Sequence, residues 1–127
     1  MSYRFQKHYT RDEARALLPQ IREWLGALRR SQQTLEASEK RLRGLQRDGG
    51  GAGGALVNDW TRTLADINDL FRAFQRREVQ IQDLDRGLID FPALIGGREV
   101  FLCWEEDEEG IESWHELDAG YAGREKL

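Results

Sequence analysis

Residues 87–124 read GLIDFPALIGGREVFLCWEEDEEGIESWHELDAGYAGR, and they hold most of the strand-forming residues of this 127-residue chain. The pair Gly96-Gly97 lies between two apolar runs, which predicts a two-residue hairpin turn. The acidic run at 105–110 predicts the next turn. The segment therefore predicts a β-meander over about 87–117, with three antiparallel strands at about 88–94, 98–105 and 111–116.

These two turns also predict the register of the strands. Pairing around Gly96-Gly97 sets Asp90 opposite Cys103, and pairing around the acidic run sets Cys103 near Ser113. Because side chains alternate between the two faces of a sheet, His115 falls on the same face as Ser113. The opposite face is the predicted core face, and it carries Ile89, Phe91, Ala93, Val100, Leu102, Trp104 and Trp114.

A long helix is predicted upstream, from about residue 11 to 47. Thr10 and Glu13 form a capping box, in which each side chain can bond the other's free backbone N–H. Apolar or small residues then recur at alternating gaps of four and three, the spacing of a heptad repeat. These residues are Leu17, Ile21, Trp24, Leu28, Ser31, Leu35, Ser38, Leu42 and Leu45.

A second helix is predicted from about residue 56 to 78, after a flexible glycine loop at 49–54. It continues the heptad spacing with Val57, Trp60, Leu64, Ile67, Phe71 and Phe74. The predicted fold is therefore α+β: one domain over 1–127, with a coiled-coil-like antiparallel helical hairpin over about 11–79 and the three-stranded sheet after it. Two helices alone leave one side of the heptad aromatics uncovered, so we expect a homodimer or a protein partner bound through the hairpin.

The residues with the clearest capacity for chemistry are Asp90, Cys103 and His115, on one face of the predicted sheet. A carboxylate, a thiolate and an imidazole are all ligands of a divalent transition metal, and Cys with His can also act as nucleophile and base. The structural alternative is a small buried Cys beside a His that hydrogen-bonds Asp90. The spacing lacks a CxxC or HxxxH motif that would decide between these alternatives.

Three further residues near the C-terminus are candidates. Glu116 and Asp118 follow His115 and are candidate metal ligands from a strand end, or else exposed acids at a strand terminus. Arg124 lies in a glycine-punctuated tail, where it could bind an anion or clamp an acid such as Asp90 or Asp118.

Composition narrows the class of protein. The net charge is −4 and a third of the residues are charged, with acids and bases interleaved, which does not favour nucleic-acid binding. One Cys cannot form an internal disulfide, the N-terminus lacks a signal peptide, and no apolar run approaches ~20 residues. A soluble cytoplasmic protein that does not enter membranes is expected.

Four motifs resemble a known family: YTRDEARALLPQI, GLIDFPA, GREVFLCW and WHELDAGYAGR. They are similar to a bacterial and archaeal family catalogued as domain of unknown function 2203. The resemblance spans both ends of the chain but implies little about mechanism, because the family is uncharacterised. Family motifs often have Gly-Glu before the third strand, where this chain has only an acidic run that ends Glu109-Gly110. The motifs emphasise Asp90, Cys103, Trp104, His115, Glu116, Asp118, Gly120 and Arg124.

Two functional hypotheses follow from the sequence. The heptads favour a self-associating interaction or scaffold protein. The alternative is a small metal-binding protein or metal-dependent enzyme with ligands on the C-terminal sheet.

Overall fold

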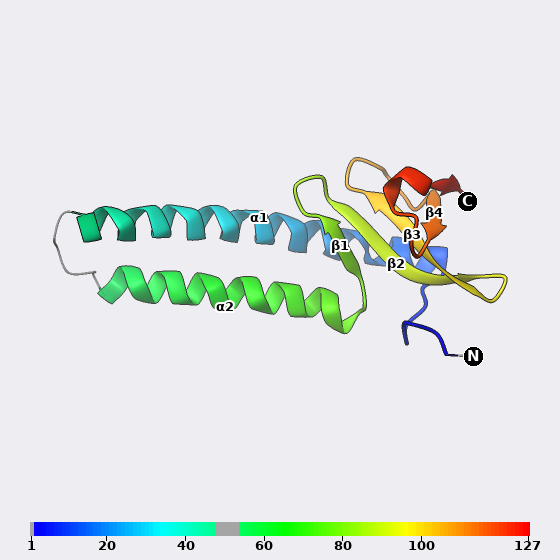
Figure 1. Ribbon diagram of the computed structural model, residues 1–127, viewed down its shortest axis with the longest axis horizontal. Coiled ribbons are helices and arrows are strands. Elements are labelled where there is room, and N and C mark those ends of the chain that lie inside the picture. The colour runs from blue at the N-terminus through cyan, green and yellow to red at the C-terminus, as the bar shows by residue number, and fades with distance from the viewer. Residues whose placement is uncertain (1, 48–53) are drawn as a thin grey trace. The chain divides into compact units, whose positions relative to one another are not determined.

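The computed structural model describes residues 2–47 and 54–127, and its chain forms two compact units. Unit 1 runs to Leu25 and resumes at Ala73, whereas unit 2 comprises Gly26–Arg72. The helices α1 (Arg11–Arg47) and α2 (Gly54–Arg76) precede all of the strands, so the α+β class is confirmed (Figure 1). The predicted glycine loop lies outside the described residues except for Gly54, which begins α2.

The sheet in unit 1 has five antiparallel strands in sequence order, not the three that the sequence predicted. They are β1 (Gln80–Asp83), β2 (Leu88–Ile95), β3 (Arg98–Glu105), β4 (Ser113–Glu116) and β5 (Glu125–Lys126). The two additional strands are the edges. β1 is a polar run of four residues with a register shift, and β5 is two exposed residues, so neither has the apolar alternation that identifies a strand.

The predicted register of the central strands is confirmed. Asp90 pairs with Cys103 across β2 and β3, and Cys103 pairs with Ser113 across β3 and β4. Gly96 and Gly97 join β2 to β3 with φ values of 59° and 78°, a turn that side-chain-bearing residues rarely adopt.

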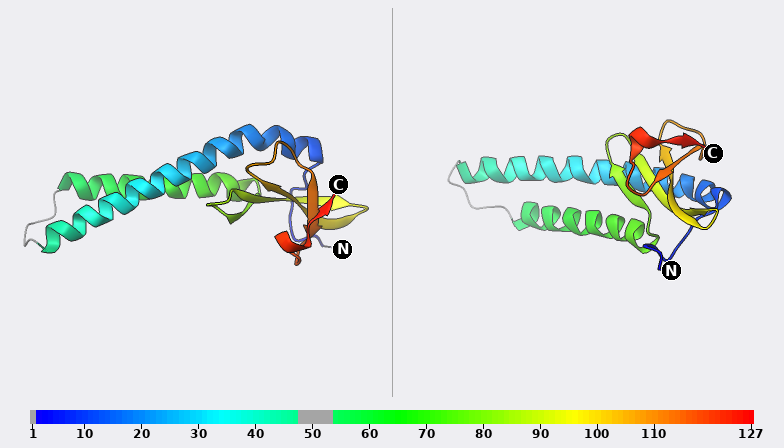
Figure 2. Two further views of the ribbon diagram at one scale, coloured as in Figure 1. Left: turned by 90° about the horizontal axis from the view of Figure 1, so that it is seen from above. Right: turned by 45° about the vertical axis from the view of Figure 1, so that its right-hand side comes forward.

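The core of unit 1 lies between one face of this sheet and the start of α1. Figure 2 shows the start of α1 and the short 3₁₀ helix η1 (Tyr121–Gly123) on opposite sides of the sheet. The Arg22 guanidinium lies 4.9 Å from the centroid of the Trp104 ring, and Arg22 also donates to the backbone oxygens of Glu106 and Glu108. Buried apolar side chains fill this layer: Ala14, Leu18, Ile21, Leu25, Ile89, Phe91, Leu102 and Trp104.

Both described helix ends in unit 1 have specific caps. The Thr10–Glu13 capping box is confirmed by backbone-to-side-chain bonds of 2.9 and 3.1 Å. At its C-terminus, α2 ends two residues earlier than predicted, in a Schellman motif in which Val79 N–H bonds Phe74 O. The left-handed position of this motif is taken by Glu78, with φ 56°, where glycine is usual.

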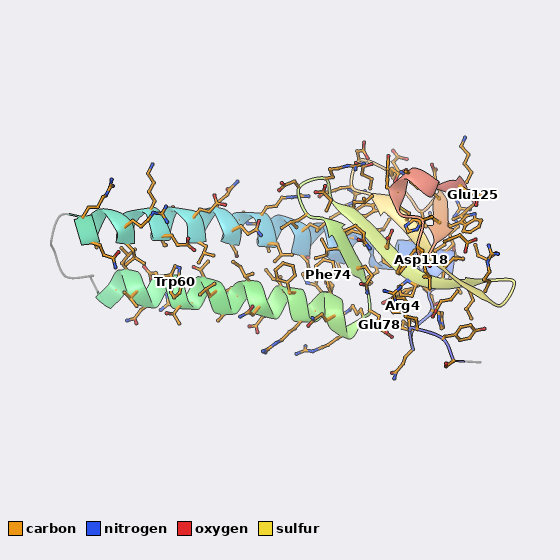
Figure 3. The ribbon with its side chains drawn as sticks, viewed as in Figure 1. Arg4, Trp60, Phe74, Glu78, Asp118 and Glu125 are labelled. Carbon is orange, nitrogen blue, oxygen red and sulfur yellow. The ribbon has the colours of Figure 1, made fainter. Side chains whose placement is uncertain are left out.

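Residues 3–9, here called the N-terminal strap, are held by two carboxylates. The Glu99 carboxylate accepts hydrogen bonds from the backbone N–H groups of Arg4 and Phe5 at 2.8 and 2.9 Å. Its Oε2 also lies 2.7 Å from the ring nitrogen Nε2 of His8. Glu78 accepts the next two N–H groups of the strap, and Figure 3 shows Arg4 and Glu78 on the same side of unit 1. The strained Glu78 therefore has a role that glycine could not fill.

In unit 2, α2 lies beside the distal part of α1. Trp60 points toward α1 (Figure 3), with its Nε1 3.5 Å from Glu39 Oε1. Burial is sparse, because among the described residues of this unit only Leu28, Ser38 and Ile67 are buried. Neither of the two described helices has an apolar stretch that could cross a bilayer.

Candidate functional site

Three neighbouring strands bring Asp90, Cys103 and His115 together, and we call these residues the triad. Asp90 and Cys103 are register partners, and His115 lies one pair along from Ser113 on the same face. This face is the one opposite the helix-covered core, as the alternation of side chains predicted. The three side chains are at most 2 % exposed, and one ligand atom from each lies within 4.8 Å of the other two.

Two hydrogen bonds determine how the His115 ring is protonated. Its Nδ1 lies 2.6 Å from the backbone oxygen of Glu116, which can only accept, so Nδ1 carries a proton. Its Nε2 lies 3.0 Å from Asp90 Oδ1, and both side chains are almost fully enclosed. Without a metal, one further proton must therefore sit between Nε2 and the carboxylate.

Burial dominates the ionisation of the other two members of the triad. Burial raises the pKa of Asp90 above its usual value, although the His115 charge and hydrogen bonds from His115, Cys103 and Gln82 oppose the rise. Burial, followed by the negative charge of Asp90, raises the pKa of the Cys103 thiol to about 12. A thiol in this state is a poor nucleophile, which does not favour Cys103 as the nucleophile of a Cys–His pair.

Two different segments cover the triad face. The strap lies over its far end, where the Phe5 ring contacts Phe101 and Phe101 contacts His115 at a centroid distance of 5.6 Å. Beside the triad, a pocket of about 220 Å³ remains between the sheet and the segment that follows β4. Its other lining residues are Gln82, Leu88, Leu117, Asp118, Gly120 and Tyr121.

The remaining candidate residues do not join the triad. Glu116 projects from the opposite face of β4 and forms an ion pair with Arg98. Asp118 lies beside the sheet on the segment after β4 (Figure 3), where it lines the pocket but is not part of the group of close ligand atoms. Arg124 donates to Glu108 Oε2 at 2.7 Å and to Ser113 Oγ at 2.9 Å. The acid that it contacts is thus Glu108 rather than Asp90 or Asp118.

Sequence reasoning missed two residues of this site. Gln82 belongs to the unpredicted edge strand β1, and its hydrogen bond lowers the pKa of Asp90. Tyr121 begins η1, and the guanidinium groups of Arg86 and Arg124 lie 4.4 and 4.7 Å from the centroid of its ring. Gly120 directly precedes Tyr121 and adopts φ 68°, a conformation that permits the tail to turn back at this point.

Comparison with curated proteins and with solved structures gives no match. A family model does match, over residues 7–127, and its description is uncharacterized conserved protein. This match covers nearly the whole chain, including all four motifs and the complete triad. The chain therefore belongs to this family of uncharacterized conserved proteins, DUF2203, as its motifs predicted.

Proposed function

We propose that unit 1 binds one divalent transition-metal ion, with zinc as the best-fitting example, through a carboxylate oxygen of Asp90, Sγ of Cys103 and Nε2 of His115. The observation that carries this proposal is the bond from His115 Nδ1–H to the backbone oxygen of Glu116. Metal-binding histidines usually donate their other ring N–H to a carbonyl or carboxylate, which fixes the tautomer and the ring orientation. Here that bond leaves the Nε2 lone pair directed at the buried cluster.

The donor set and its environment support the same proposal. Oxygen, sulfur and nitrogen donors in one small cluster suit Zn²⁺ and its neighbours in the transition series better than Mg²⁺ or Ca²⁺. The ion would take the place of the proton shared between Asp90 and His115. It would also hold Cys103 as a thiolate despite the high pKa of the free thiol, because a coordinated thiol is deprotonated.

Zinc-dependent stabilisation tests this function. An ion that binds only the folded protein stabilises it by about 2.7 kcal/mol at a free concentration of 100 Kd. We expect zinc to raise the thermal midpoint of the natural protein and of Glu116→Gln, a carboxylate control on the opposite face. We expect no such rise for Cys103→Ser. An equal rise in Cys103→Ser would show that zinc binds elsewhere and would contradict the proposal.

We also propose a second function, self-association of unit 2 as an antiparallel helical hairpin that pairs with a second copy of the chain. The supporting observation is the exposure of heptad residues: Val57 and Phe71 are 38 % and 37 % exposed. Acids and bases alternate along both helices, as in the pairs Glu39–Arg43 and Asp59–Arg62. Such interleaving lets an antiparallel second copy place its acids opposite the bases of the first copy. This favours a second copy over a partner with a strong charge of one sign.

The oligomeric state tests this second function. We expect light scattering coupled to gel filtration to give twice the chain mass for the natural protein, and one chain mass for Val57→Lys/Phe71→Glu. Thr61→Lys, an exposed substitution on the same helix outside the heptad positions, is the control and should remain dimeric. A monomeric natural protein at micromolar concentration would contradict self-association.

A further inference from the structure

The pocket beside the triad gives the proposed metal centre an opening. Its volume of about 220 Å³ exceeds that of several water molecules, since each water occupies roughly 30 Å³ in the liquid. All three members of the triad line it, so the pocket lies directly beside these buried side chains. The other polar lining groups come from Gln82, Asp118 and Tyr121.

The number of ligands is the second observation. Tetrahedral zinc takes four ligands, and structural sites supply all four from protein, whereas catalytic sites supply three and leave one position for an exchangeable ligand. Among residues 2–47 and 54–127, the close group of metal-ligating side chains around the triad has three members. Asp118 lines the same pocket without belonging to that group, so it is placed to contact a ligand of the metal rather than the metal.

We infer that the metal centre is of the open type: its fourth position faces this pocket and holds an exchangeable small ligand, normally water, whose proton the Asp118 carboxylate accepts in a hydrogen bond. This inference rests on the proposed metal-binding function. Asp118 is an exposed carboxylate that lines the pocket, so its charge makes the pocket favour a neutral, protic ligand over an anion. Small monodentate anions such as azide can still compete for the position, but against the repulsion of Asp118.

The test uses protein loaded with one Co²⁺ per chain, whose visible absorption depends on the ligands of the metal. Azide is added to the natural protein, to Asp118→Asn and to the carboxylate control Glu116→Gln. We expect azide to change the spectrum in all three proteins. Removal of the Asp118 charge should tighten azide binding by about 3- to 10-fold, the size expected for one charge a few ångströms away in a partly hydrated site. Glu116→Gln should bind azide as the natural protein does.

The outcomes separate the inference from the function on which it rests. A cobalt spectrum that requires Cys103 but does not respond to azide in any of the proteins would show a closed site and overturn the inference alone. Equal azide affinity in Asp118→Asn and the natural protein would overturn the role of Asp118. Failure of Co²⁺ to bind, or binding that survives Cys103→Ser unchanged, would overturn the proposed metal function itself.

Discussion

The buried pair of Asp90 and His115 gives a quantitative prediction for the metal-free protein. Both side chains are 2 % exposed, so His115→Ala leaves a buried carboxylate without its partner. Removal of one partner of such a pair destabilises a protein by about 3–5 kcal/mol. Asp90→Asn is different, because His115 Nδ1–H is already held by the Glu116 oxygen and its Nε2 can accept a bond from the new amide. A neutral bond then replaces a charged one, a difference of about 1 kcal/mol.

Urea unfolding with a chelator present measures both variants without a contribution from metal. The urea concentration at the unfolding midpoint should fall strongly for His115→Ala and slightly for Asp90→Asn. The m value, the dependence of the unfolding free energy on urea, should be unchanged in both variants. Asp118→Asn is the control, because it makes the same substitution at an exposed carboxylate. It should change the free energy of unfolding by about 0.5 kcal/mol or less. If Asp90→Asn destabilises the protein as much as His115→Ala, the assigned tautomer and the shared proton are wrong.

Three further predictions concern the caps and the strap. Thr10→Ala should lower the free energy of unfolding by about 1 kcal/mol in urea, and Thr10→Ser should restore most of it, because the hydroxyl accepts the first-turn N–H. Burial of Glu99 opposes ionisation, but hydrogen bonds from the strap outweigh it and hold the pKa below its usual range. The ionised Glu99 side chain therefore stabilises the fold above about pH 4.3, and this contribution is lost as the pH falls through the lower pKa of the folded state. In urea unfolding, the difference in stability between the natural protein and Glu99→Gln should shrink in acid. Glu78→Gly removes the carboxylate that accepts the Gln6 and Lys7 N–H groups, so hydrogen exchange at these two amides should become faster. The free energy of unfolding should stay nearly unchanged, because glycine also relieves about 1 kcal/mol of left-handed backbone strain.

The parts of the fold that could be predicted were those with local signals. Thr10 and Glu13 marked the start of α1. Gly96-Gly97 set the β2–β3 register, and the acidic run at 105–110 set the β3–β4 register. The end of α2 was placed two residues late, because Glu78 occupies the position where glycine normally signals a C-cap. The edge strands could not be predicted, since β1 is a short, mostly polar run with a register shift and β5 has only two exposed residues, so neither carries the apolar alternation of a strand.

The candidate site, too, was predictable only where a local rule of the sequence applied. Register alone brought Asp90, Cys103 and His115 to one face, because successive residues alternate across a sheet. The same rule excludes Glu116, which follows His115 directly and must point the other way. The contribution of Tyr121 could not be predicted, because its contacts with Arg86 and Arg124 depend on how the tail folds back and not on the local sequence pattern.

Elemental analysis tests the central claim most directly. The natural protein, purified without a histidine tag, should contain about one transition-metal ion per chain, as a tetrahedral site with these donors implies. His115→Ala, purified in parallel, should contain almost none, and Glu116→Gln should match the natural protein. Absence of metal from the natural protein, together with no uptake after incubation with zinc, would contradict the account and leave the triad as a buried structural hydrogen-bond network.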